Sequence, residues 1–232
     1  MAAKVSSAVI RRLPRYYRYV QSLCSQGISR VSSNELAQAL GFTASQVRQD
    51  FSCFGGFGQQ GYGYNTETLR DRLAEILNLQ AGCRGVIVGM GSMAQSLFTD
   101  GVFSRCGVSI AACFDTDPEK IGRVIGDVTV LDAAMLEQFC MEFHPAVAVL
   151  TCPGSAAQST ADILMRCGVR GIWNFTSVDI QAEGSRTAVE NVHLADSLMT
   201  LCCRIPAQQE ARESMPLSER LAMRVFAPLG NR

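Results

Sequence analysis

Residues 85–98 read GVIVGMGSMAQSLF, and this stretch decides the fold of the larger part of the chain. The β-branched residues Val86, Ile87 and Val88 predict a buried strand, and the segment after the glycines has the composition of a helix. The two are joined by G-x-G-x-x-A, in which the first glycine permits a tight turn and the second admits a pyrophosphate. Ala94 in the last position lets the helix pack closely on the strand. The stretch therefore predicts the first strand, turn and helix of a dinucleotide-binding domain.

An acidic residue follows this turn at the distance that such a domain requires. The strand-like segment VSIAACFD ends at Asp115, some 24 residues beyond Gly91. A carboxylate there accepts hydrogen bonds from ribose hydroxyls and repels a 2′-phosphate, so the expected cofactor is NAD (NADH/NAD⁺) and not NADP. The free N–H groups of the helix N-terminus favour the pyrophosphate. The expected cofactor-binding residues of this part are Gly89, Met90, Gly91, Ser92, Met93, Ala94 and Asp115.

Strand-like and helical segments alternate through the rest of the chain to residue 205. The strand-like runs are VTVL, AVAVLT, GIWNF and VENVHL, and the helical stretches are 131–142, 156–167 and 194–205. This alternation predicts an α/β domain, a Rossmann-like doubly wound parallel sheet, over residues 85–205. Ligands of such sheets bind beyond the carboxyl ends of the strands. We therefore expect the nicotinamide half of the dinucleotide near Thr151, Cys152, Pro153 and Asn174.

Residues 1–80 have the pattern of a smaller, helical domain. An amphipathic helix is expected over residues 7–26. Two short helices follow in VSSNELAQALGFTASQVRQDFSCFG, the first capped by Ser32 or Ser33 and the second by Thr43. A glycine-containing turn between two such helices is typical of a helix-turn-helix unit, whose second helix enters the DNA major groove. The same pattern also fits a helical hairpin with no role in DNA binding.

The second short helix carries the candidate base-reading residues. With Val47 and Phe51 turned inward, its exposed positions include glutamines, which pair with adenine, and an arginine, which pairs with guanine or a phosphate. The segment FGGFGQQGYGYN (residues 54–65) has five glycines and predicts a tight hairpin that acts as a wing. A helix over residues 65–78 and a linker over 79–84 complete this part. The DNA-binding candidates are Arg11, Arg12, Ser45, Gln46, Arg48, Gln49, Gln59, Gln60 and Tyr62.

The charge distribution agrees with two parts of different function. Residues 1–80 hold nine basic and five acidic side chains, a net charge of +4, whereas the remaining residues hold twelve basic and sixteen acidic ones, a net charge of −4. A basic amino-terminal part on an acidic body is typical of a nucleic-acid reader joined to a ligand domain. Chance drift of a few charges would produce the same asymmetry.

The run LAQALGFTASQVRQDFSCFGGFGQQGYGY (residues 36–64) resembles the winged-helix domain of the Rex family of redox-sensing transcriptional repressors. The resemblance continues through the carboxyl-terminal half and covers roughly residues 5–205. It implies a homodimer that binds a palindromic operator, senses the NADH/NAD⁺ ratio and leaves the DNA when NADH binds. It also implies that the terminal helix over 194–205 is exchanged between subunits. Residues 206–232 extend beyond the usual end of the family, and no function is assigned to them.

The chain departs from the family pattern at several positions. Gln59 and Gln60 stand where the wing usually carries basic residues, which predicts weaker DNA binding or an altered operator. Asp100 replaces a tyrosine and His193 replaces an aspartate, two positions that the resemblance ties to the NADH-dependent change. One hypothesis is that Asp100 and His193 form a replacement pair that makes sensing pH-dependent. The alternative is two unrelated surface substitutions.

Two other functions remain open on the sequence alone. A DNA-binding regulator with a thiol or another ligand as its sensor would use Cys152, which is expected at a ligand-facing strand end. An NAD-dependent oxidoreductase would need a general acid or base near the nicotinamide, but the only lysines are Lys4 and Lys120 and no Y-x-x-x-K pair exists. We therefore do not expect an enzyme.

The composition excludes further classes of protein and site. The ten cysteines form no C-x-x-C pair and only two histidines are present, so no metal site is expected and most thiols are predicted to be small buried hydrophobes. There is no run of about 18 uncharged apolar residues, and arginines interrupt the first helix where a signal peptide would be apolar. No membrane association is expected, and the predicted compartment is the cytoplasm.

Overall fold

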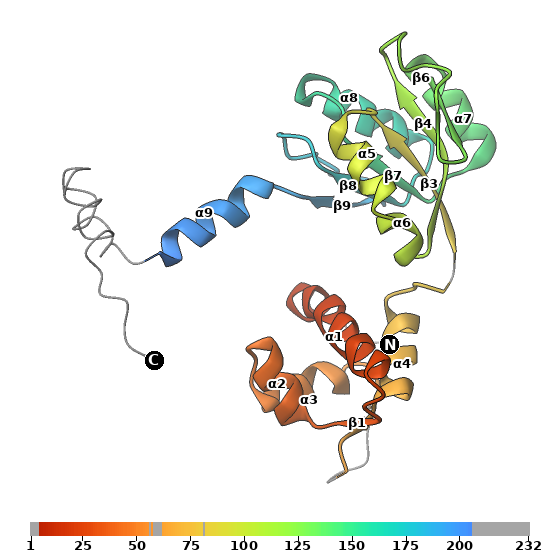
Figure 1. Cartoon of the computed structure of the whole chain (residues 1–232). Helices are drawn as coiled ribbons and strands as arrows, with labels where there is room; N and C mark the ends of the chain where they lie inside the picture. Colours follow the sequence, from red (N-terminus) through yellow and green to blue (C-terminus); the bar gives the residue numbers. More distant parts are fainter. Residues whose placement is uncertain (1–4, 56, 58–61, 81, 206–232) are drawn as a thin grey trace, which may run out of the picture.

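The computed structural model describes residues 5–55, 57, 62–80 and 82–205 (Figure 1). The predicted carboxyl-terminal extension and the wing residues Gln59 and Gln60 lie outside these residues. The described chain forms a helical amino-terminal domain and an α/β carboxyl-terminal domain, as the sequence predicts (Figure 1).

The amino-terminal domain has four helices and a two-stranded antiparallel sheet. They are α1 (Ser7–Ser25), β1 (Arg30–Val31), α2 (Ser33–Leu40), α3 (Ala44–Ser52), β2 (Tyr64–Asn65) and α4 (Thr66–Ile76). Tyr16, Phe51 and Leu73 are almost completely buried where α1, α3 and α4 meet. The domain thus has a core of its own.

Local sequence signals begin and end these helices where predicted. Ser32 forms a capping box with Glu35, because the Ser32 hydroxyl accepts from the Glu35 N–H and the Glu35 carboxylate accepts from the Ser32 N–H. Gly41 ends α2 in the left-handed conformation, with φ of 71°. Thr43 caps α3 and Asn65 caps α4, each by accepting a backbone N–H three residues on.

The strand that follows the glycine-rich segment pairs with a strand far away in the sequence. The turn of the hairpin predicted within residues 54–65 lies outside the described residues, and Tyr64 of β2 pairs with Val31 of β1, which precedes the helix-turn-helix unit. Val31 and Tyr64 are both buried in the core of this domain. Gly63 is required here, since its φ is +69° and a Cβ would lie 2.8 Å from the Val31 carbonyl oxygen.

The carboxyl-terminal domain is built on a seven-stranded sheet in the order β5-β6-β4-β3-β7-β8-β9. All pairings are parallel except β5–β6, which form a hairpin around Gly126 that the sequence did not reveal. Because α4 ends at Ile76 and β3 begins at Cys83, the linker lies two residues earlier than the predicted 79–84. The strands are β3 (Cys83–Val88), β4 (Val108–Asp115), β5 (Val124–Ile125), β6 (Val128–Asp132), β7 (Val147–Leu150), β8 (Gly171–Asn174) and β9 (Ala188–Asn191).

Alternate residues of the central strand β3 bury into two separate cores. Val86 and Val88 pack toward α7 and α8, whereas Ile87 packs with Ala94 of α5 and Phe103 of α6. Helices therefore cover both faces, which confirms the doubly wound architecture. The helices are α5 (Ser92–Thr99), α6 (Val102–Arg105), α7 (Leu136–Phe143), α8 (Gly154–Arg166) and α9 (Leu194–Arg204), with the 3₁₀ turn η1 (Ala133–Met135) before α7.

The cysteines divide between core and surface, so the prediction that most are buried is wrong. Cys113 and Cys140 are fully buried, and burial raises the pKa of both thiols to about 12. Four others are exposed because they lie at the C-caps of α3 and α6 or on α9, none of whose residues is buried. The exposed thiols are Cys53, Cys106, Cys202 and Cys203.

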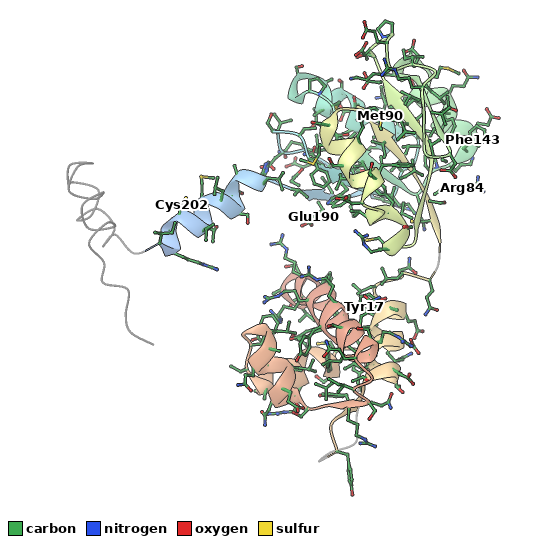
Figure 2. All side chains as sticks on the ribbon, viewed as in Figure 1. Tyr17, Arg84, Met90, Phe143, Glu190 and Cys202 are labelled. Carbon is green, nitrogen blue, oxygen red and sulfur yellow. The ribbon has the colours of Figure 1, made fainter. Side chains whose placement is uncertain are left out.

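The last helix, α9, stands away from the sheet (Figure 1). None of its residues is buried, and Cys202 and the other side chains of α9 project freely around it (Figure 2). Large apolar side chains among them are half exposed or more: Leu194, Leu198, Met199 and Leu201.

Candidate functional site

The turn between β3 and α5 is held close to the loop that follows β7. Gly89 has φ of +95°, and a Cβ at this position would lie 2.6 Å from the backbone nitrogen of Cys152. Only glycine fits such a contact. The Thr151 hydroxyl donates to the Gly89 carbonyl oxygen at 2.7 Å, so the two loops are also joined by a side chain.

The N-terminus of α5 is open to solvent. Gly91 is the N-cap residue, makes no side-chain cap, and has empty space where a Cβ would be. Ser92 and Met93 are exposed in the first turn, and Ala94 is buried against the sheet. The first N–H groups of the helix therefore meet no side-chain acceptor and are available to an anion.

Asp115 lies at the carboxyl end of β4, but most of its hydrogen-bonding capacity is already used. Its carboxylate is 8% exposed and accepts from the Met90 N–H at 2.7 Å, the Asp117 N–H at 2.9 Å and Lys120 Nζ at 3.1 Å. Burial by itself raises the pKa of Asp115, but these three donors lower it below its usual value. An ionised carboxylate has about four acceptor sites, so roughly one remains for a ribose hydroxyl.

Lys120 is a member of this site that the sequence did not predict. Its ammonium group also lies 3.6 Å from Asp117, and the two carboxylates raise its pKa. The spacing of Asp115, Asp117 and Lys120 in FDTDPEK carries the signal, since a turn after the strand brings the lysine back onto the first aspartate.

A second helix N-terminus without a side-chain cap follows β7, and Ser177 and Val178 lie beside its first residue, Gly154. Pro153 is the N-cap of α8 and makes no side-chain cap. Cys152 is half buried, and its pKa is raised because burial outweighs the hydrogen bonds that favour the thiolate. This weighs against Cys152 as a reactive thiol sensor. Thr151, Cys152 and Pro153 do lie at the predicted edge of the sheet.

Asn174 does not face a ligand with its side chain, contrary to the prediction. Its side chain is completely buried. The amide donates to the Val178 carbonyl oxygen and to Asn191 Oδ1, and its oxygen accepts from the Thr176 N–H. Asn174 therefore joins the ends of β8 and β9, because the loop after β8 folds back over it.

The hypothesis that Asp100 and His193 pair is wrong within one chain. Among the described residues no hydrogen bond or ion pair joins them; instead, His193 Nε2 lies 2.7 Å from Asp179 Oδ1. This hydrogen bond raises the pKa of His193. Asp100 is exposed at the C-cap of α5. The sequence could not reveal Asp179, which lies in the irregular loop between β8 and β9.

The second helix of the helix-turn-helix unit, α3, presents most of its predicted residues. Val47 and Phe51 are buried, which leaves Ser45, Arg48 and Gln49 exposed and Gln46 partly exposed. Ser52, which was not predicted, shares the exposed face one turn after Arg48. Arg11 is exposed on α1, and Tyr62 is 72% exposed beside the wing.

Arg12 is not free, contrary to its prediction as a DNA-binding residue. Its guanidinium group forms an ion pair with the buried Asp50 of α3. The sequence gives no signal for this pair because 38 positions separate the two residues.

Two further observations concern other kinds of site. Within the described ranges, no three His, Cys, Asp or Glu side chains gather into a group that would hold a metal ion. Among the same residues, no helix combines the length and apolar character that crossing a membrane demands.

The fold and the open N-terminus of α5 define a class: a helix-turn-helix domain joined to a Rossmann-type dinucleotide domain. Comparisons with known proteins agree. Residues 4–52 match the family described as "Putative DNA-binding protein N-terminus", and residues 84–178 match the family described as "CoA binding domain".

Full-length relatives narrow the class to one family. The chain is 47% identical over 201 residues to a redox-sensing transcriptional repressor Rex from Caldicellulosiruptor bescii, covering 87% of this chain and 92% of the relative. It is 43% identical to a Rex protein from Clostridium botulinum, over 87% of this chain and 95% of the relative. The chain belongs to the Rex family of redox-sensing transcriptional repressors.

Solved structures of a Rex-family repressor, RSP, have the same fold. The crystal structure of RSP with β-NAD⁺ and operator DNA is 39% identical, with a TM-score of 0.82, and covers 98% of this chain and 100% of its own. The structure of RSP with β-NADH is 38% identical, with a TM-score of 0.82, and covers 91% and 99%.

Proposed function

We propose that this protein is a DNA-binding transcriptional repressor that senses the NADH/NAD⁺ ratio and leaves a palindromic operator when NADH binds. The observation that carries the proposal is the open N-terminus of α5 beside Gly89, next to a second helix N-terminus without a side-chain cap, that of α8, at the same edge of the sheet. Such an edge fits a dinucleotide pyrophosphate. The palindromic operator and the response to the NADH/NAD⁺ ratio are proposed because the chain belongs to the Rex family.

Each part of the dinucleotide has a place in this site. The pyrophosphate approaches the backbone at Gly89, Met90 and Gly91 and the first turn of α5. The remaining acceptor of Asp115 meets the adenosine ribose. Thr151, Cys152 and Pro153 border the nicotinamide half, because they end the strand next to β3.

The helix α3 reads the operator. The B-DNA major groove is about 12 Å wide and admits one helix. Ser45, Arg48 and Gln49 project from the exposed side of α3 toward base edges or phosphates. The DNA phosphate backbone on either side of the groove is contacted by Arg11, Gln46, Tyr62 and the wing glutamines Gln59 and Gln60.

A homodimer presents two such helices to the two half-sites. The apolar side chains of α9 are uncovered, and a shallow cavity of about 280 Å³ on β7–β9 is lined by Val147, Ile172, Trp173 and Val189. We assign α9 to a second copy of the chain, as the family resemblance implies. The two reading helices then lie about 34–36 Å apart, one turn of DNA.

NADH releases the dimer only if it binds the DNA-incompetent arrangement more tightly. A rotation between the two dinucleotide domains that changes the spacing of the α3 helices provides this difference. An allosteric coupling of about 1–3 kcal/mol is typical and shifts affinity roughly 5- to 150-fold. The repressor works in the cytoplasm, where the operator and the NADH pool are both present.

Fluorescence anisotropy of a labelled operator tests the proposal. The purified protein is bound to the RSP operator at fixed salt and titrated with NADH and then with NAD⁺. We expect release at a far lower concentration of NADH than of NAD⁺. Tight binding that ignores both nucleotides would remove the sensor, and Cys152→Ser under peroxide would then test the thiol alternative. Absence of binding to this and related palindromes would contradict the repressor.

A further inference from the structure

The carboxylate of Asp50 is held by three donors from α1. Asp50 lies on α3 and is 2% exposed, and Arg12 is 18% exposed. Arg12 Nε donates to Oδ2 and Nη2 donates to Oδ1, both at 2.7 Å, so the guanidinium group binds the carboxylate with two parallel hydrogen bonds. The buried Tyr16 hydroxyl also donates to Oδ2 at 2.7 Å.

The same side of α1 also holds the turn before α3. Arg15 donates to the Leu40 carbonyl oxygen at 2.7 Å and lies over the Phe42 ring, 4.6 Å from its centroid. The ring of Tyr16 contacts Phe42 and Phe51 edge-on, with centroids 5.5 and 5.0 Å apart. Arg12, Arg15 and Tyr16 thus hold both ends of the turn and the inner side of α3.

Asp50 lies on the opposite side of α3 from Ser45 and Arg48, because helical residues turn by about 100° each. Resting on the DNA-reading role of α3 proposed above, we propose that Arg12 is a positioning residue: it sets the rotation of α3 about its axis and does not contact DNA. A guanidinium fork fixes the orientation of a carboxylate, whereas a lysine ammonium is a point charge that fixes only its distance. Operator specificity then depends on this fork and on the Tyr16 hydroxyl, which donates to the same carboxylate.

The charge of Asp50 is a second argument that Arg12 stays paired with it. An unpaired carboxylate on the reading helix would repel the phosphates on either side of the groove. If Arg12 turned toward a phosphate, Asp50 would remain buried, and Tyr16 would be the one hydrogen-bond partner left to it among the described residues. Its neighbour Arg11 is exposed and makes a matched control for a direct phosphate contact.

Anisotropy with two labelled duplexes, the RSP operator and a scrambled sequence, separates the two roles in the full-length protein. For Arg12→Lys we expect operator affinity to fall about tenfold or more, scrambled-duplex affinity to change less than about twofold, and the salt dependence to keep its wild-type slope. For Tyr16→Phe, which keeps the ring and the arginine fork, we expect a loss of about threefold on the operator only. Arg11→Ala, as a phosphate contact, weakens both duplexes and lowers the slope by about 0.9.

An Arg12→Lys protein that behaves like Arg11→Ala overturns the proposal, and so does one that binds both duplexes like the wild type. Circular dichroism and NADH binding check that each variant is folded. If Arg12→Lys does not fold, Tyr16→Phe decides the question: an equal loss on both duplexes, or none, overturns the proposal.

A wild-type protein with no preference for the operator would instead show that the proposed function has failed. The positioning role is then read without DNA from the amide NMR shifts of Ser45–Ser52. We expect Arg12→Lys to displace these shifts along the whole helix and Arg11→Ala to leave them in place. Unchanged shifts in Arg12→Lys would overturn the positioning role on their own.

Discussion

The helices of the two domains begin in different ways. In the amino-terminal domain a side chain accepts a backbone N–H at the start of each α-helix, and the caps are Ser6, Ser32, Thr43 and Asn65. In the carboxyl-terminal domain none of the described α-helices has a side-chain cap, and two of them, α5 with Gly91 and α8 with Pro153 as N-cap residues, start at the carboxyl edge of the sheet. A side-chain cap satisfies one of the first N–H groups of a helix, whereas an uncapped helix leaves them available to water or to a ligand.

The two functional helices are also held in place by different means. α3 is oriented by side chains, above all the contact of Arg12 with Asp50. The turn before α5 is held by the close backbone approach of Gly89 to Cys152 and by the Met90 N–H, which donates to the Asp115 carboxylate, and the first turn of α5 is exposed. Two fluorescent probes separate the domains, since all five tyrosines lie in residues 1–80 and the one tryptophan is Trp173.

The largest expected effect is that of Gly89→Ala. The added Cβ meets the Cys152 backbone nitrogen at 2.6 Å in a conformation with φ of +95°, so the turn must move. We expect a loss of about 3 kcal/mol or more in the free energy of unfolding, and no NADH binding. Urea unfolding followed by Trp173 fluorescence measures it.

Gly122→Ala is the matched control for this clash. Its φ is +84°, but nothing lies within 4 Å of the added Cβ. It should therefore show only the conformational cost of about 1–2 kcal/mol. Equal losses for the two variants would mean that the close approach of the loops is unimportant.

Gly91→Ala should separate ligand binding from stability. Its added Cβ meets nothing within 4 Å and its φ is −81°, so we expect the free energy of unfolding to change by less than about 1 kcal/mol. The methyl group occupies the space above the helix N-terminus, so NADH should bind about tenfold or more weakly. Isothermal titration calorimetry measures the affinity. Unchanged NADH binding would remove the pyrophosphate from this turn.

Thr43→Ala should cost about 1 kcal/mol, the usual contribution of a side-chain cap. The Thr43 hydroxyl accepts from the Gln46 N–H at 3.1 Å, so its removal leaves a donor at the start of α3 unpaired. Tyrosine fluorescence during urea unfolding reports the loss. Thr43→Ser keeps the oxygen and should retain most of the stability; a Thr43→Ser protein as weak as Thr43→Ala would assign the effect to the lost methyl group.

The smallest effect concerns pH at the base of α9. The hydrogen bond to Asp179 raises the folded pKa of His193 above its ordinary value of 6.5. Its contribution to stability is therefore fully present below that value and is lost as the pH rises through the higher folded pKa. Asp196 is the other carboxylate that raises this pKa.

The melting temperatures of Asp179→Asn and of the wild type, measured by thermal melts, should differ at about pH 6 and become equal by about pH 9. Asp100→Asn is the control, because no hydrogen bond or ion pair links Asp100 to His193 among the described side chains. If Asp100→Asn and not Asp179→Asn removes the pH dependence of the melting temperature, the pKa of His193 is set by Asp100 of another subunit.

The sequence predicted features that neighbouring residues determine. The caps of α2, α3 and α4, the end of α2 at Gly41 and the G-x-G turn came out as expected, because each depends on a few adjacent side chains and on glycine conformations. The helix predicted over 131–142 instead begins at Leu136, because β6 runs to Asp132 and a 3₁₀ turn follows it. The doubly wound sheet followed from the alternation of strands and helices.

The missed features depend on residues far apart in the chain. The partner of Arg12, the pairing of β1 with β2 and the contact of His193 with Asp179 all cross intervening elements. Asn174 was predicted to bind the ligand because the carboxyl ends of parallel strands face the ligand site. Its buried amide instead forms hydrogen bonds with the loop after β8 and with β9, because a buried polar group bonds the partners that surround it. Composition and periodicity do not predict such long-range contacts.

The bare surface of α9 has a thermodynamic consequence. The helix has 11 residues and buries none of them in its own chain, and isolated helices shorter than about 12–15 residues are marginal in water. Under the proposed dimer, α9 becomes ordered only as it docks, so part of the folding reaction is bimolecular. The melting temperature then rises with protein concentration by mass action. The concentration of the protein in the cell would then determine which fraction of the chains is dimeric, with α9 docked.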